Sequence, residues 1–132
     1  MKESVGDLMV LRAARPISAG EEITHSYDAS SDYDVRGAAA LMNTWGFKCT
    51  CALCLAEEAD GPALRKKRRE LEGEAAVLVE RETAVGAKWL SVVKARRLAK
   101  AIDDTHDDER YKGLPRTALL RIQKWLVEAT TR

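Results

Sequence analysis

Residues 45–54 read WGFKCTCALC, and they contain all three cysteines of this 132-residue chain. Cys49, Cys51 and Cys54 cannot form a complete set of disulfides, because their number is odd and the first two flank a single residue. Three thiolates this close together are typical of a metal site in a reducing compartment. Structural zinc takes four ligands, so the stretch predicts a zinc knuckle whose fourth ligand lies elsewhere.

The charge of the chain is nearly balanced. Its 22 Lys and Arg side chains against 21 Asp and Glu give a net charge of +1, which does not support a global attraction to nucleic acid or to a membrane surface. No apolar run approaches the roughly 18 residues that a membrane span needs. Residues 1–7 are polar and do not resemble a signal peptide, so we expect a nuclear or cytoplasmic protein that is not secreted.

The N-terminal part mixes strand and helix signals. Residues 7–13 form a short apolar run, and residues 21–27 alternate polar and apolar side chains after a turn at Gly20. These two segments predict a β-hairpin. A short helix is expected over about residues 38–44, with Gly46 in the left-handed conformation that ends it.

The C-terminal part is dense in Ala, Leu, Arg, Lys and Glu. Apolar side chains at helical spacing predict three antiparallel helices, one that starts at Pro62, one over residues 87–102 and one that starts at Pro115. We therefore expect an α+β fold, in which a hairpin, a short helix and the cysteine knuckle precede a helical region.

Two segments together resemble a known family. Residues 19–27 read AGEEITHSY, and after Arg36 and Leu41 the chain reaches the aromatic and cysteine pattern of residues 45–54. In this order and at these distances they resemble the C-terminal end of a SET domain that continues into its post-SET zinc knuckle. The pattern is similar to the SET- and MYND-containing subfamily and to related fungal-type SET proteins. The resemblance implies three regions: the end of a SET domain over 1–47, a post-SET knuckle over 48–56 and a helical region over 57–132.

The resemblance also implies an activity. SET proteins transfer a methyl group from S-adenosylmethionine to a lysine ε-amine of a protein substrate, which here could be histone or non-histone. By position, Tyr27 matches the tyrosine whose hydroxyl aligns the reacting groups. Phe47 matches an aromatic residue against the cofactor, Trp45 an aromatic residue at the lysine channel, and the three cysteines match zinc ligands.

The sequence departs from the family pattern in one respect. It contains neither the Asn-His-x-Cys motif, whose cysteine supplies the fourth zinc ligand in similar proteins, nor the Gly-x-Gly segment that holds the cofactor. Neither His25 nor His106 follows an Asn, and both are expected to be solvated rather than to ligate zinc. We therefore expect the isolated chain to be inactive and to associate with a missing N-terminal half or a partner chain.

Other readings of the chain are less specific. A different class of function is a non-catalytic, zinc-stabilised helical module for protein interaction. The basic residues 65–69 fit a solvated helix face better than a nuclear-localisation signal or a nucleic-acid contact. The acidic residues within 103–109 fit a polar linker better than a calcium site. Trp89 and Trp125 are expected to anchor the helical core, with a peptide groove as the lesser alternative.

Overall fold

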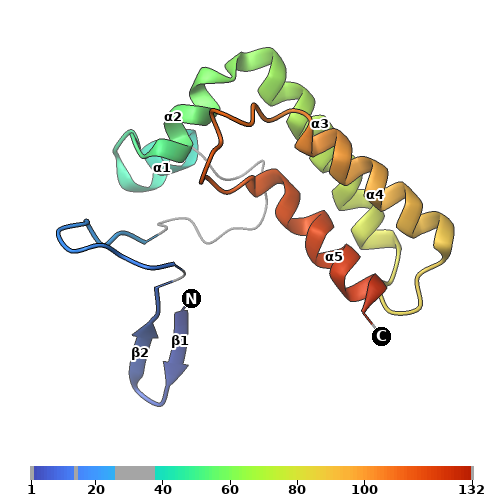
Figure 1. Ribbon diagram of the computed structural model, residues 1–132, viewed down its shortest axis with the longest axis horizontal. Helices are drawn as coiled ribbons and strands as arrows, with labels where there is room; N and C mark the ends of the chain where they lie inside the picture. Colours follow the sequence, from blue (N-terminus) through green and yellow to red (C-terminus); the bar gives the residue numbers. More distant parts are fainter. Residues whose placement is uncertain (1, 14, 26–37, 132) are drawn as a thin grey trace.

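The structure is a computed structural model that describes residues 2–13, 15–25 and 38–131. It confirms the expected α+β class: a two-stranded hairpin is followed by helices (Figure 1). The strands are β1 (Lys2–Val5) and β2 (Leu8–Leu11). The helices are α1 (Ala38–Trp45), α2 (Ala52–Ala59), α3 (Gly61–Arg81), α4 (Trp89–Asp103), a 3₁₀ turn η1 (Thr117–Leu119) and α5 (Leu120–Thr130).

The hairpin differs from the one expected. Strand β2 lies within the predicted strand 7–13, but it pairs antiparallel with β1, and Val5 lies opposite Leu8. Residues 21–25 form no strand, and residues 26–27 lie outside the described residues. Gly6, with φ of 59°, begins a two-residue turn, and so short a turn closes at less entropic cost than the longer connection that we expected.

Two short helices lie next to the cysteines, and the second, α2, contains Cys54. Helix α1 covers the expected segment, and Gly46 ends it with φ of 73° and an amide that donates to the Met42 carbonyl at 3.0 Å. Helix α2 was not expected as a separate element. It ends at Asp60, after which Gly61, with φ of 81°, redirects the chain into α3.

The hydrophobic core lies in the helical array of α3, α4 and α5 (Figure 1). The three helices confirm the sequence prediction, although the third begins as η1 and becomes α-helical only at Leu120. The Nε1 of Trp125 donates to the Glu82 carbonyl at 2.7 Å, which fastens α5 to the end of α3. The buried core residues are Ala75, Leu78, Ala84, Val92, Ala95, Leu98, Ile102, Ala118, Leu119, Ile122 and Trp125.

Three side chains in the helical part contradict the sequence expectations. Trp89 is not a core anchor, because it is 68% exposed, whereas Trp125 is in the core. Lys66 lies on a solvated face and pairs with Glu70 at 3.9 Å as expected, but Arg68 in the same basic run is fully buried. His106 is buried rather than solvated. In each case the packing of a neighbouring element, which the local pattern does not specify, decides the burial.

None of the helices in the described part of the chain is both long and apolar enough to cross a membrane.

Candidate metal centre

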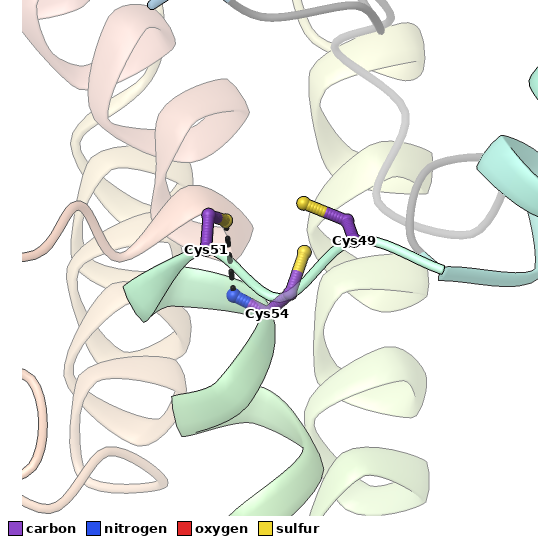
Figure 2. Close-up of side chains that lie close together, drawn as sticks. All are labelled: Cys49, Cys51 and Cys54. Atoms are coloured by element: carbon purple, nitrogen blue, oxygen red, sulfur yellow. Dashed lines mark hydrogen bonds between the residues drawn. The ribbon is translucent and has the colours of Figure 1, made fainter. Parts of the chain in front are cut away.

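The three cysteines converge at the start of α2 (Figure 2). Their Sγ atoms all lie within 4.8 Å of one another. Within the described residues, no other group of three or more His, Cys, Asp or Glu side chains lies close enough to hold a metal ion. The close spacing in the sequence therefore becomes a cluster of three sulfur ligands in space.

Local structure explains this convergence. Cys51 is the N-cap of α2, with φ of −64° and ψ of 160°, and its Sγ accepts a hydrogen bond from the Cys54 amide at 3.5 Å (Figure 2). An N-cap side chain turns back toward the first helical turn, where Cys54 lies. Cys49 precedes the cap in a segment without regular secondary structure, and the adjacent Lys48 pairs with Glu58 of α2 at 3.1 Å. The helix start and this ion pair therefore hold both ends of the cysteine stretch.

The cysteine thiols differ in acidity. Burial, together with hydrogen bonds and charge from Cys51 and Cys49, raises the pKa of Cys54 to about 12. Burial also acts against ionisation of Cys51, but hydrogen bonds from the Cys54 amide and from the neighbouring thiols outweigh it and lower the pKa of Cys51. Of these two thiols, Cys51 is therefore the more acidic.

The cluster fits a soft divalent metal ion. Zinc–sulfur bonds of about 2.3 Å in a tetrahedron place sulfur atoms roughly 3.8 Å apart. The observed spacing needs only a small side-chain adjustment to reach this geometry. The described residues provide three ligands, and a fourth Cys, His, Asp or Glu does not join them there. The cluster could therefore hold a metal ion and leave one coordination position for another group.

Of the other expected site residues, only Trp45 and Phe47 lie beside the cluster in sequence. Trp45, the last residue of α1, is 57% exposed, and Phe47 is half-buried after the turn at Gly46. Tyr27, the expected catalytic residue, lies outside the described residues. His25 is exposed as expected, and neither His25 nor His106 belongs to the cysteine cluster.

A buried polar network was not expected from the sequence. It centres on Asp60, between α2 and α3, whose Oδ2 accepts from Nη2 of Arg68 at 2.8 Å and from the Tyr111 hydroxyl. Its Oδ1 accepts from Nη1 of Arg110 at 2.6 Å. Arg68 also donates to the Thr105 hydroxyl at 2.9 Å and to the Thr105 carbonyl at 2.7 Å. The network joins the end of α2, which follows the cysteines, to the segment after α4.

The network shifts the ionisation of its members. Burial of Asp60 alone would raise its pKa, but hydrogen bonds from Tyr111, Arg68 and Arg110 outweigh burial and hold the pKa below its ordinary value. Burial and the hydrogen bond to Asp60 raise the pKa of Tyr111. Asp60 therefore stays charged and Tyr111 stays protonated at neutral pH.

His106 borders this network. Its ring packs edge-on against Tyr111 with centroids 4.7 Å apart, and its Nδ1 lies 2.9 Å from the Ile102 carbonyl oxygen. Burial, and then the positive charge of Arg68, lower the pKa of His106. A signal for the network was present in the sequence: Arg68 falls at helical spacing with the apolar residues Leu64, Leu71 and Ala75 of α3.

Part of this chain is similar to part of a known protein. A protein named methyltransferase, from Gibberella zeae, is 27% identical to this chain over 103 residues. The matched segment is 77% of this chain but only 14% of that protein. No family model matches the sequence, and no solved structure matches it. The chain is thus similar to a small part of a much longer protein that carries the name methyltransferase.

Proposed function

We propose that this chain contains the end of a SET-type catalytic domain with its post-SET zinc site, and that it serves a protein-lysine methyltransferase. The observation that carries the proposal is the cysteine cluster, which directly follows the aromatic positions Trp45 and Phe47. The similarity to a fungal protein named methyltransferase supports methyl transfer as the general chemistry. The SET class, the lysine substrate and zinc as the metal rest on the sequence motifs.

Each residue has a proposed task. Tyr27 would use its hydroxyl to align the target amine and the methyl donor, which lowers the barrier by orientation and not by strong base catalysis. Trp45 would provide an aromatic wall to the lysine channel, where an apolar surface favours the neutral amine over the charged one. Phe47 would contact the cofactor. Cys49, Cys51 and Cys54 would bind zinc as thiolates.

The chain by itself does not enclose the cofactor. S-adenosylmethionine supplies the methyl group in the proposed reaction, but the sequence has no Gly-x-Gly segment to hold it and no Asn-His-x-Cys. The hairpin side chains Val5, Leu8, Met9 and Leu11 are exposed. We propose that a further N-terminal SET segment, in the same protein or in a partner chain, completes the cofactor site and supplies the fourth zinc ligand. Isolated residues 1–132 would then be inactive.

The second candidate function is a zinc-stabilised helical module for protein interaction. One observation favours it: the buried core is made by α3, α4, η1 and α5 with the α3–α4 connection, and among the residues whose burial is described it includes none from β1, β2 or α1. This helical array could therefore contribute a binding surface without taking part in catalysis. Absence of methyl transfer in the test below, together with metal binding by the cysteines, would favour this alternative.

The test compares two proteins. The first is residues 1–132 alone, and the second is a longer protein that also contains the segment encoded directly upstream. Calorimetry measures S-adenosylmethionine binding, and a radiolabelled methyl-transfer assay uses core histones and a lysine-rich non-histone protein. We expect no cofactor binding by the chain alone. We expect methyl transfer by the longer protein, reduced by about 100-fold in Tyr27→Phe because the hydroxyl that aligns the reacting groups is lost. Tyr33→Phe is the matched control and should retain activity.

Two results would contradict the proposal. Cofactor binding by residues 1–132 alone would show that the site is not split in this way. Methyl transfer by the longer protein that is equal in Tyr27→Phe and wild type would remove Tyr27 from the reaction.

A further inference from the structure

The outward face of α4 has an unusual charge distribution. Residues 83–102 contain five basic side chains and no acidic one, although the whole chain is balanced at +1. All five basic residues are exposed: Lys88, Lys94, Arg96, Arg97 and Lys100. The basic run of α3 differs, because there Lys66 pairs with Glu70 and Arg68 is buried against Asp60. The positive charge of α4 is therefore not neutralised within its own helix until Asp103 at its C-terminal end.

Apolar side chains accompany these charges. Trp89 and Leu90, in the first turn of α4, are 68% and 79% exposed, and neither belongs to the buried core. Val93, one turn later, is half-buried on the same face. The guanidinium of Arg96 lies 5.9 Å from the Trp89 ring centroid, so a cation and an aromatic surface are presented together.

The acidic residues that flank this stretch in the sequence leave most of its positive charge unpaired. Glu82 precedes the acid-free stretch, and Asp103 and Asp104 end the helix. Asp103 accepts from Arg116 at 2.7 Å, and Asp104 pairs with Lys100 at 3.1 Å. Within the described residues, Lys94 and Arg97 in the middle of the helix take part in no ion pair, so their charge is available to a ligand.

We propose that this α4 face, made of Trp89, Leu90, Val93, Lys94, Arg96, Arg97 and Lys100, binds an acidic segment of a partner protein that also carries apolar side chains. Charge complementarity selects an acidic ligand, because carboxylates would meet Lys94, Arg97 and Arg96. The apolar residues select a protein over a nucleic acid, since phosphates would use the cations but leave Leu90 and Val93 against a polar backbone. Aromatic and Arg side chains together are also the groups that contribute most to protein interfaces.

The probe for the test is a fluorescein-labelled peptide of about 14 residues, Glu with Leu at every third or fourth position, so that its apolar side chains share one helix face. Fluorescence anisotropy measures its binding to the full 132-residue chain. We expect saturable binding that weakens as the salt concentration rises from about 50 to about 300 mM, because screening reduces the charge contribution. A poly-Glu peptide of equal length should bind more weakly by about tenfold, because it lacks the apolar contacts.

Two pairs of variants assign the binding to α4. Lys94→Glu with Arg97→Glu, and separately Trp89→Ala with Leu90→Ala, should each weaken binding by at least about tenfold. All four residues are exposed, so the fold should persist, which circular dichroism would check. The matched control is Lys124→Glu with Val127→Ala, which makes the same kinds of change on exposed positions of α5 and should leave binding unchanged.

Several results would overturn the proposal. These are absence of peptide binding, equal loss in the α5 control, or tighter binding to a DNA duplex or to vesicles that contain phosphatidylserine. Equal affinity for poly-Glu and for the Glu/Leu peptide would show that apolar contacts do not contribute, which contradicts the proposed class of ligand. None of these outcomes depends on methyl transfer or on metal binding.

Discussion

Arg68 donates from Nη2 to Oδ2 of Asp60 at 2.8 Å, and both side chains are fully buried. The pair joins the interior of α3 to the junction where α2 ends, and Tyr111 and Arg110 add hydrogen bonds from the segment after α4. Removing one member of a buried ion pair leaves the other charge uncompensated. The position of the cysteine-bearing α2 on the helical array therefore depends on this network.

Asp60→Asn should destabilise the protein by about 3 kcal/mol, because the shape is preserved but the charge that balances Arg68 is lost. Urea unfolding followed by circular dichroism measures this change. Asp104→Asn is the control, since its pair with Lys100 is exposed and contributes about 0.5 kcal/mol or less. Equal effects of the two substitutions would show that burial of the pair does not matter.

The same carboxylate should make the protein sensitive to acid. Because the pKa of Asp60 is lowered in the folded protein, the unfolded chain takes up this proton first as the pH falls. The contribution of Asp60 to the free energy of unfolding is therefore present above its ordinary pKa of 3.8 and is lost as the pH falls further. Unfolding curves at decreasing pH should show this loss in wild type and a smaller loss in Asp60→Asn. The same pH dependence of the free energy of unfolding in wild type and in Asp60→Asn would argue against this role of Asp60.

His106 should affect the free energy of unfolding at higher pH than Asp60 does. Its pKa is below 6.5 in the folded protein because of burial and the charges of Arg68 and Arg116, although carbonyl groups of Ile102 and Asp103 act in the opposite direction. The unfolded chain protonates near pH 6.5 while the folded chain resists protonation, so the free energy of unfolding should fall below that pH. His106→Asn should reduce this dependence, as measured by thermal unfolding between neutral pH and pH 5. An unchanged slope would contradict the prediction.

The cysteine cluster should bind one metal ion per chain through sulfur. A titration with cobalt(II), monitored by the thiolate-to-cobalt charge-transfer absorption, measures the affinity of the cluster for the metal. Cys51→Ser or Cys54→Ser should lower affinity by on the order of 100-fold or more, since even changes outside the ligand set cost about 10–100-fold. Thr50→Ala, between two of the cysteines, is the control and should retain the wild-type spectrum. Equal affinities would show that the cluster is not the metal site.

Gly46→Ala, at the end of α1 just before the cysteines, should destabilise the protein without a steric clash. The position has φ of 73°, and an added Cβ would meet no atom within 4 Å, so the expected cost of about 1–2 kcal/mol comes from the left-handed backbone alone. Gly73→Ala, inside α3 and equally free of contacts, should instead be neutral or stabilising by up to about 1 kcal/mol. Unfolding measurements that show the same sign for both would contradict this explanation.

Some features follow directly from local sequence. The apolar spacing predicted the helices that became α3, α4 and α5, because a helix needs one continuous face to bury. Gly46 and the spacing of the cysteines predicted the end of α1 and the cluster, since both depend on a few adjacent residues. The expected pairing of residues 7–13 with 21–27 was wrong, because strand pairing is a choice between partners and the nearer one, β1, forms the shorter turn.

The α+β class, the helical C-terminal part and the grouping of three sulfur ligands follow from the sequence, because they depend on periodicity and short-range spacing. The burial of Arg68 and His106 and the exposure of Trp89 result instead from tertiary packing. Burial depends on which face of a helix a distant element covers. The segment after α4 supplies Thr105 and Tyr111 as partners of Arg68, in addition to Asp60, whereas no described neighbour buries the outward face of α4.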